Sequence, residues 1–420
     1  MTAPENVLCG LVERVFDHTA LHQLGGTEES LLLTDFLACV TAANVGHVQD
    51  GWVKDGTSGY AANLAVRAHL RDQDDVYWRA GIHPGSIVWP VVLAVGAEVG
   101  AGGSLVAAAA RAGYSAMSVL AMTLGPRHAR SWHATATSGG FGAAAAAAML
   151  LGLDPNQRFW ACSHAVAVAG GVGQALVERS GTTAFHRAAA AVVGIQAARL
   201  AAAGLPSSLH ALDGESGLLA LLGQESERTL DAETDGVLEA TSVRLYPING
   251  LCQAAVELAA KLRRQVGAGA VSALVVEVSD ATAAATTGNP GGDWWDLRAG
   301  VAAAWTSADP FQLESSPDSA MIRDQVEVRT GSVGPGATRV TVRAPGVVLT
   351  EYKESPPGLM LREPGLSNLL ERKWARLIGG SERNVEELKD LTATLLSRGP
   401  QVRDVVSLLA PSEAARRSPQ

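Results

Sequence analysis

The stretch HATATSGGFGAAAAAAMLLGLD, residues 133–154, predicts a helix of almost pure alanine that follows a loop rich in threonine, serine and glycine. Alanine is the best helix former, and its small side chain lets helices pack closely together. Similar apolar segments, separated by Gly, Pro, Ser or Asp, recur up to about residue 240. Several are apolar on all sides, as is typical of helices surrounded by other helices. We therefore predict a large all-α domain over residues 1–242.

The pattern changes from residue 243 onward. Short β-branched runs with alternating polar residues are separated by turn signals such as GPG and APG, which is typical of a small antiparallel sheet. Helices are expected over residues 253–265 and 294–306, on one face of that sheet. These features predict a smaller α+β lid domain at residues 243–358. The strand-like runs are SALVVEVSD, DQVEVRTG, TRVTVRAPG and VVLTEYKES.

Helical periodicity returns from Leu366. The C-terminal helices of residues 359–420 are therefore expected to return to the helical domain, which would make that domain discontinuous. The predicted fold class is mostly α, with a large helical domain and a smaller α+β lid. A cleft between two such domains is the usual place for a ligand.

Composition and charge argue against several classes of protein. The net charge is −9 and no basic stripe occurs, which argues against a nucleic-acid partner. The cysteines lack CxxC spacing, which argues against a zinc site and favours a reducing compartment. The N-terminus carries acids where a signal peptide needs a basic start, and polar groups such as Arg111 interrupt the long apolar stretches. We expect a cytoplasmic protein without a membrane partner.

Charge is concentrated in AHLRDQDDVYWRAGIHPGS, residues 68–86. If the preceding helix continues, Asp72 and Asp75 share one face and Asp74 points away. Glycine and proline then break the helix, which leaves His83 on a loop before the next buried helix, well placed for proton transfer. An exposed acidic helix end and a divalent metal bound by the aspartates are the alternatives.

The predicted loop after His133 combines hydroxyl groups, backbone N–H groups and the positive end of the alanine helix. Together these groups favour the binding of an anion. Its glycines let the backbone approach a ligand, although tight helix packing explains them equally well. The residues expected to bind substrate here are Thr135, Thr137, Ser138 and Gly139.

Two further segments carry candidate partners for a substrate carboxylate. SGTTAFHRAAAA, residues 180–191, places His186 and Arg187 at the start of another alanine-rich helix. VRLYPING, residues 243–250, lies at the predicted domain junction. Arg244 there is a candidate for a forked contact with a carboxylate, and a salt bridge at the hinge is the alternative.

The order of these motifs resembles the MmgE/PrpD family. The segments that carry the resemblance are HLRDQDD with HPG, AGY, HATATSGGFGAAAAAAMLLGLD, TT-x-x-H and RLYP. The similarity as a whole runs from about residue 30 to at least 350. The family includes 2-methylcitrate dehydratase, cis-aconitate decarboxylase and iminodisuccinate epimerase. The resemblance implies a large helical domain with a smaller α/β lid, usually in a homodimer, and an activity that needs no metal or other cofactor.

The resemblance also implies which residues are catalytic. Asp72 matches the family's active-site aspartate, and His83 and His133 match its two histidines. His83 and His133 would form an acid–base pair, in which one takes a proton and the other delivers one. Asp72 would fix the tautomer or raise the basicity of its histidine.

Other positions depart from the family's pattern and concern the substrate. Thr183 and Arg244 stand where lysines are usual, Asn249 stands where the decarboxylase branch has histidine, and His186 is retained. Loss of a lysine forfeits a charge-assisted hydrogen bond, typically about 1.5–3 kcal/mol. The substrate is therefore not expected to be methylcitrate itself. Trp78 favours a bulkier and less charged ligand.

These observations predict a metal-independent, lyase-like enzyme, either a dehydratase or a decarboxylase. It would abstract a proton α to a carboxylate or carbonyl group of a small metabolite. An isomerase, epimerase or cyclase of a specialised biosynthetic pathway, using the same histidines, is the close alternative. A non-catalytic ligand-binding homologue is the second alternative. The expected partners are the small-molecule substrate and a second copy of the chain.

Overall fold

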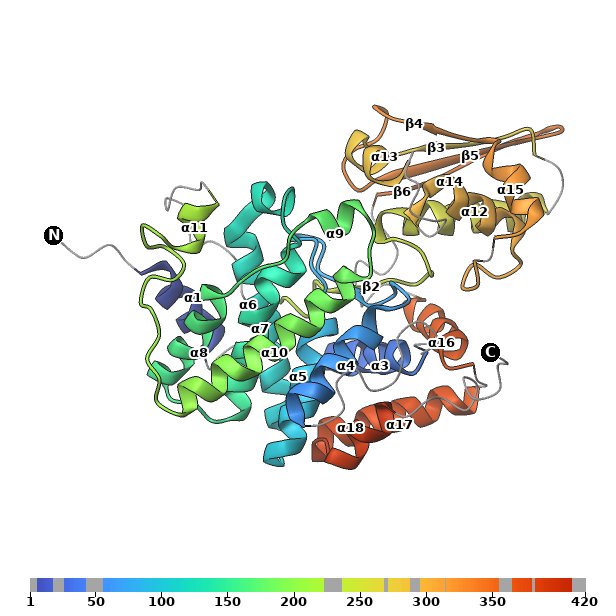
Figure 1. Ribbon diagram of the computed structural model, residues 1–420. Coiled ribbons are helices and arrows are strands. Elements are labelled where there is room, and N and C mark those ends of the chain that lie inside the picture. Colours follow the sequence, from blue (N-terminus) through green and yellow to red (C-terminus); the bar gives the residue numbers. More distant parts are fainter. Residues whose placement is uncertain are drawn as a thin grey trace. The chain divides into compact units, whose positions relative to one another are not determined.

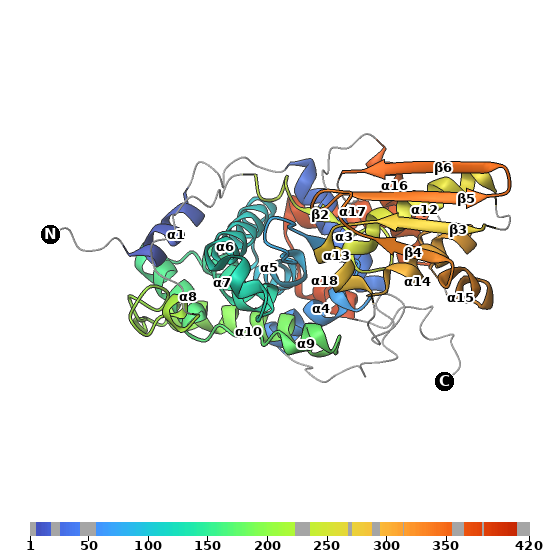
Figure 2. The ribbon, with the colours of Figure 1, turned by 90° about the horizontal axis from the view of Figure 1, so that it is seen from above.

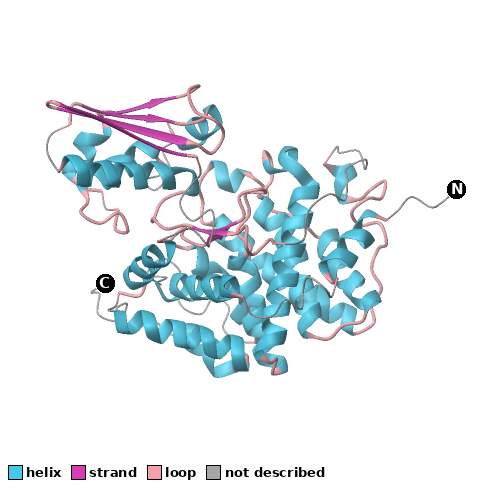
Figure 3. Cartoon of the chain, turned by 180° about the vertical axis from the view of Figure 1, so that it is seen from behind, coloured by secondary structure: helices cyan, strands magenta, loops and turns pink. Residues whose placement is uncertain are grey.

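The computed structural model describes residues 6–17, 26–42, 56–222, 236–267, 271–287, 295–313, 315–354, 365–379 and 382–409. The protein is mostly α-helical, which confirms the predicted fold class (Figure 3). The chain forms two compact units, one from residues 1–242 and 377–420 and the other from residues 243–376. The expected end of the α+β domain, between residues 358 and 359, lies outside the described residues.

The core of the larger unit is built from long helices of small residues (Figure 1). Helix α7 packs closely against α6 and α10. A Cβ atom on Gly194 of α10 would lie 2.3 Å from the Cβ of Ala143 on α7, and one on Gly142 of α7 would lie 2.7 Å from the carbonyl oxygen of Gly113 on α6. The helices approach this closely because no larger side chains separate them. The core helices are α4 (Thr57–His69), α5 (Gly85–Val99), α6 (Gly103–Ala129), α7 (Ala134–Leu150) and α10 (Thr182–Ala202).

Shorter and more peripheral elements complete the larger unit. The two C-terminal helices belong to it, because α17 packs against α3 and α6 and α18 packs against α4 and α5. These elements are α1 (Val7–Val15), α3 (Thr27–Ala42), β1 (Asp75–Val76), α8 (Pro155–Ala167), α9 (Gln174–Val177), α11 (Leu218–Leu221), α17 (Glu382–Arg398) and α18 (Val402–Leu409). The short strand β2 (Ser242–Val243) lies at the boundary between the two units.

Helix α6 is, among the described residues, the one that is long and apolar enough to cross a membrane. Within the fold, 78% of the apolar stretch of this helix is buried. Its Arg111 forms an ion pair with Glu29 of α3. A buried apolar helix of this kind is what the core of a helical domain requires.

The smaller unit contains a four-stranded sheet in the order β4-β3-β5-β6 (Figure 2). Strands β5 and β6 pair in antiparallel fashion, as do β3 and β5. Burial alternates along β5, where Thr338, Val340 and Val342 are buried and the residues between them are not, as expected for a sheet covered on one face. The strands are β3 (Ala273–Glu277), β4 (Val326–Arg329), β5 (Thr338–Ala344) and β6 (Val347–Lys353).

The prediction of an antiparallel sheet is wrong at one edge, because β4 runs parallel to β3. A tight turn joins antiparallel strands, whereas parallel strands need a longer crossover. The crossover here contains α13 (Asp280–Thr286), α14 (Leu297–Thr306) and α15 (Pro317–Arg323). Helices α12 (Gln253–Val266) and α14 pack on the sheet, near the residue ranges expected for them.

Helix α16 (Leu366–Leu377) is held within the smaller unit up to Arg376. Arg376 bonds to Asp309 at 2.7 Å, and Arg372 stacks over the ring of Phe311. Residues 359–420 were expected to return together to the helical domain. In the structure, α17 and α18 lie in the larger unit, whereas α16 lies in the smaller one because these contacts hold it there.

Candidate active site

His83 lies on the segment that joins α4 to α5. Helix α4 ends at His69, and a bridge between Tyr77 and Ile82 turns the chain back toward α5. The Nδ1 atom of His83 lies 2.6 Å from the carbonyl oxygen of Asp75, to which it must donate a proton. This hydrogen bond leaves Nε2 as the basic nitrogen of the neutral ring.

Asp75 stabilises the turn that carries His83. Its carboxylate accepts hydrogen bonds from the Gly85 N–H at 2.9 Å and from the Tyr114 hydroxyl at 2.6 Å. Burial raises the pKa of Asp75 to about 7, although both hydrogen bonds oppose the shift. Asp72 and Asp75 were expected to share a helix face if the preceding helix continued. It does not, because α4 ends at residue 69 and Asp72 adopts a left-handed backbone with a φ of 52°.

A buried cluster of paired charges lies beside this turn. Asp74, which was expected to point away, has Oδ1 3.2 Å from the Nδ1 of His69 and Oδ2 3.7 Å from the Nε of Arg187. Asp72 approaches the same nitrogen, with its Oδ1 3.7 Å from His69 Nδ1. Burial and the Arg187 charge lower the pKa of His69, and the two aspartates oppose that shift. Buried carboxylates thus face a buried guanidinium group, as desolvated charges require.

Three residues of this cluster have the donor chemistry of a metal site. His69, Asp72 and Asp74 offer ligand atoms that lie within 4.8 Å of one another. Imidazole and carboxylate oxygens suit several divalent cations. However, the Arg187 guanidinium, whose Nε lies 3.7 Å from Asp74 Oδ2, already brings positive charge to the same carboxylate. The electrostatics therefore favour the ion-pair arrangement.

His133 immediately precedes α7 and is paired with His186 of α10. The two Nδ1 atoms lie 3.0 Å apart and the ring centroids 5.3 Å apart. Burial holds the pKa of His133 well below its usual value, and the charges of Arg187, His186, His83 and His69 lower it further. Burial also lowers the pKa of His186.

The contact between the two rings determines their tautomers. One Nδ1 must donate and the other must accept, so both rings cannot carry a proton on Nδ1 without repulsion. The donating ring therefore presents a basic Nε2, and the accepting ring presents an Nε2–H group. A single hydrogen bond thus gives the site one proton acceptor and one proton donor, both uncharged near neutral pH.

The hydroxyl-rich stretch after His133 is the first turn of α7 and not the predicted loop. The Thr135 hydroxyl oxygen accepts from the N–H of His83 at 3.3 Å, which ties the two histidine-bearing segments together. Ser138 donates to the carbonyl oxygen of Ala134 in its own helix. A Cβ on Gly139 would lie 2.4 Å from Cδ1 of Ile87, so this glycine serves close helix packing.

Thr137 connects α7 to a second histidine that sequence reasoning missed. Its hydroxyl donates to the carbonyl oxygen of Gly170 at 2.9 Å and lies 3.1 Å from Nε2 of His128, which must therefore donate to it. His128 stacks on Trp132 with ring centroids 6.1 Å apart. Burial lowers the pKa of His128 to about 4, so the ring is neutral at pH 7. Only the tertiary contact with Thr137 reveals this residue.

A loop of glycines fixes the backbone of His133. The His133 N–H donates to the carbonyl oxygen of Gly171 at 2.8 Å. Gly171 has a φ of 113°, and a Cβ there would lie 2.4 Å from the Cβ of Ala136. The position therefore requires glycine on two grounds, backbone conformation and space.

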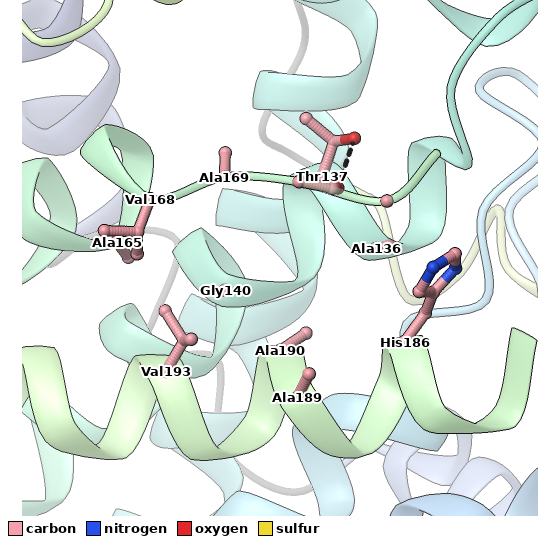
Figure 4. Close-up of a pocket in the computed structure, with 12 residues that line it drawn as sticks. Ala136, Thr137, Gly140, Ala165, Val168, Ala169, His186, Ala189, Ala190 and Val193 are labelled. Carbon is pink, nitrogen blue, oxygen red and sulfur yellow. Dashed lines mark hydrogen bonds between the residues drawn. The ribbon is translucent and has the colours of Figure 1, made fainter. Parts of the chain in front are cut away.

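A small cavity lies next to His186, between α7, α10 and the end of α8 (Figure 4). Its volume is about 120 Å³. The lining is formed by Ala136, Thr137, Gly140, Ala165, Val168, Ala169, Gly170, Gly171, His186, Ala189, Ala190 and Val193.

The remaining predicted residues fall into two groups. Thr183 lies with the cluster, its hydroxyl oxygen 3.4 Å from Nε2 of His69. Trp78 lies in the turn before His83. Arg244 and Asn249 belong to the smaller unit, where Arg244 is buried and Asn249 accepts from the N–H of Leu251 at the start of the 3-10 helix η2 (Gly250–Cys252).

The larger unit thus brings together many of the predicted residues and adds three that were not selected. His69 and Asp74 join Asp72, and His128 supports Thr137. His69 stood within the charged stretch, at the end of its helix, and a search for histidines next to carboxylates would have found it. His128 had no comparable signal. Asp72, which was expected to orient a catalytic histidine, lies beside His69.

The fold and this site define a helical domain with neutral, oriented histidines, which is suited to proton transfer. Residues 57–231 match the family model of the MmgE/PrpD N-terminal domain, and this match supports membership of the chain in the MmgE/PrpD family. The matched range includes every histidine described above. No curated protein matches the chain. Membership of this family indicates a dehydratase-like or lyase-like enzyme.

Proposed function

We propose that the chain is a metal-independent dehydratase or decarboxylase that removes a proton α to a carboxylate or carbonyl group of a small metabolite. The observation that carries this proposal is the 3.0 Å contact between the Nδ1 atoms of His133 and His186. A pair of uncharged imidazoles that share one proton, here one buried and one partly buried, can accept a proton at one ring and donate one from the other without a change in net charge.

His83 supplies the base in this mechanism. Its Nδ1 proton is held by the carbonyl oxygen of Asp75, so Nε2 carries the lone pair that takes the α proton of the substrate. The electron pair of the broken C–H bond moves into an enolate. In a dehydration, the enolate then expels the β-hydroxyl group, which takes the Nε2 proton of His133 and leaves as water. The Nδ1 proton of His186 moves to Nδ1 of His133 in the same step, and solvent returns a proton to Nε2 of His186, so neither ring becomes an anion.

Burial prepares the second group for its role. Burial holds the pKa of His133 well below its usual value, so the ring is neutral at pH 7 and, when it accepts from His186, the proton it offers is the one on Nε2. It can deliver that proton to a leaving group because His186 supplies another proton to its Nδ1 across the 3.0 Å contact. His186, through Nδ1, decides which nitrogen of His133 carries the proton.

An isomerase or epimerase is the second candidate. It is favoured by the fact that two separately held imidazoles, His83 on one segment and the His133–His186 pair on another, could exchange protons with two faces of one carbon. Such an enzyme needs the same proton abstraction but no leaving group.

Proton abstraction can be tested before the substrate is known. The protein is incubated in heavy water with small hydroxy, unsaturated and branched carboxylic acids, and mass spectrometry follows deuterium uptake at the α carbon. Loss of water, loss of carbon dioxide or an unchanged heavy-atom mass distinguishes dehydratase, decarboxylase and isomerase. A chelator in parallel samples is expected to leave the rate unchanged.

Variants connect this reaction to the proposed residues. We expect H83A and H133A each to lower the exchange rate by about 10²-fold or more. H210A is the matched control, because His210 bonds to Asp213 at a position where its side chain is 54% exposed. Near-normal exchange in both active-site variants would contradict the mechanism, and binding without any exchange in the native protein would favour a non-catalytic homologue. The substrate class, a homodimer and a cytoplasmic location belong to the same proposal.

A further inference from the structure

The cavity beside His186, called the apolar cavity below, is not used by the proton-transfer chemistry. Figure 4 shows Ala189, Ala190 and Val193 of α10 on one side and Ala165 and Val168 on another, with His186 at one end. No lining residue is larger than valine apart from His186. The space exists because helices of small residues meet here without filling it.

Several polar atoms of the lining are already engaged within the protein. The Thr137 hydroxyl donates to the carbonyl oxygen of Gly170 and accepts from His128. The carbonyl oxygen of Gly171 accepts from the N–H of His133. A carboxylate placed among these groups would lose its hydration without gaining a charged partner, which is strongly unfavourable. The apolar cavity therefore selects an uncharged group.

The volume limits the size of that group. A cavity of about 150 Å³ lined by apolar side chains is known to hold a benzene molecule. The apolar cavity measures about 120 Å³, so it has room for an alkyl or alkenyl branch of about four carbons. A longer chain would have to leave through the open side.

His186 places the apolar cavity next to the reactive pair. The residue lines the cavity and also bonds to His133 through Nδ1. A branch that fills the cavity would therefore hold the rest of the substrate close to the His133–His186 pair. Specific contacts with a non-reacting part of a substrate position the reacting part.

We propose that the apolar cavity is the specificity pocket for a short, uncharged alkyl or alkenyl branch of the substrate, whose carboxylate or carbonyl end reacts at the histidines. This inference rests on the proposed function and deepens it. The substrate class is a small acid with one apolar branch, and Ala165, Ala189 and Ala190 determine the branch length that is accepted.

The test measures affinity as a function of chain length. Isothermal titration at pH 7 is carried out with lactate, 2-hydroxybutyrate, 2-hydroxyvalerate and 2-hydroxyhexanoate. Each buried methylene group is expected to strengthen binding about fourfold, which corresponds to about 0.8 kcal/mol, up to the length that fills the apolar cavity. An affinity that does not rise with chain length in the native protein, including no binding at all, would overturn the proposal.

Substitution of the lining gives the second arm. Ala189→Leu fills the apolar cavity from a half-buried position on α10, so the rise with chain length should disappear while lactate binding stays. Ala202→Leu is the matched control, since Ala202 is an exposed residue of the same helix outside the lining, and it should keep the native trend. Ala189→Val, a milder change, should flatten the trend in part even if the leucine variant does not fold. An unaltered trend in both residue 189 variants would overturn the proposal.

The outcome is separable from that of the proposed function. His83 does not line the apolar cavity, so H83A should lose proton exchange and keep the rise of affinity with chain length. If H83A keeps exchange while the trend depends on Ala189, the mechanism fails and the pocket stands. If H83A loses exchange while Ala189 variants keep the trend, the pocket fails and the mechanism stands.

Discussion

The two histidine-bearing segments of the larger unit keep their imidazoles in contrasting surroundings. Near His83, charge is buried and paired, with Asp74 3.7 Å from the Nε of Arg187. Near His133, the neighbours are the backbone carbonyl group of Gly171 and the second neutral ring of His186, which lines the apolar cavity. The His83 ring is oriented by a hydrogen bond within a charged network, whereas the His133 ring is kept neutral first by desolvation and then by the Arg187 charge. The same residue type thus obtains a defined proton state by two different physical means.

Arg187→Met should have the largest effect on stability, because it removes the positive charge that pairs with Asp74 near His83. The substitution leaves the Asp74 carboxylate buried without its guanidinium group, and such a loss typically costs about 3–5 kcal/mol. We expect the free energy of unfolding, measured by urea denaturation at pH 7, to fall by that amount.

Two further variants show whether charge pairing is the reason. Arg199→Met breaks a pair with Glu98 whose side chains are 38% and 41% exposed, and it should cost less than about 1 kcal/mol. The double variant R187M/D74N should recover much of the lost stability. If R187M is no worse than R199M, the two segments do not differ in the way described.

Gly171→Ala perturbs the surroundings of His133 through the backbone. Alanine at a φ of 113°, with its Cβ 2.4 Å from that of Ala136, should lower the free energy of unfolding by about 2–3 kcal/mol. It should also reduce α-proton exchange, because the N–H of His133 bonds to the Gly171 carbonyl oxygen.

The neighbouring glycine provides the control for that experiment. A Cβ at Gly170 meets no atom within 4 Å, and its backbone is not in the left-handed region. Gly170→Ala should therefore change stability by less than about 0.5 kcal/mol. Equal losses in the two variants would mean that the loop is sensitive to any side chain and that the His133 contact is not the cause.

Acidification should lower the free energy of unfolding through the desolvated histidines, by somewhat less than the substitutions above. The pKa of His128 is lowered from 6.5 to about 4, so its contribution to stability is complete above pH 6.5 and is lost as the pH falls toward 4. Between pH 7 and pH 5 this residue alone should remove about 2 kcal/mol from the free energy of unfolding.

A comparison with H128N isolates that contribution, since asparagine does not titrate. Thermal or urea denaturation at both pH values should show a smaller loss in the variant than in the native protein. Asp75 acts in the opposite direction, because its pKa is raised to about 7 and its contribution is lost as the pH rises. Both proteins carry Asp75, so its contribution cancels when the pH profile of H128N is subtracted from that of the native protein. Identical pH profiles would show that His128 is not held neutral.

Parts of the candidate site could be predicted because their signals are local. His83 before a proline, His133 before an alanine helix and His186 at the start of another were all selected from adjacent residues. The roles within the aspartate cluster could not be assigned in this way. Asp74 and Asp75 are neighbours, yet Asp74 lies beside His69 and Asp75 is bonded by Tyr114 of α6.

The sequence by itself determined that this protein is mostly helical, since alanine content and apolar periodicity act within a few residues of the chain. Only the tertiary structure decided that α4 ends at His69, that Arg187 neutralises Asp74 and that His133 meets His186. Proton states and charge pairing depend on burial and on partners distant in the chain, and those are properties of packing.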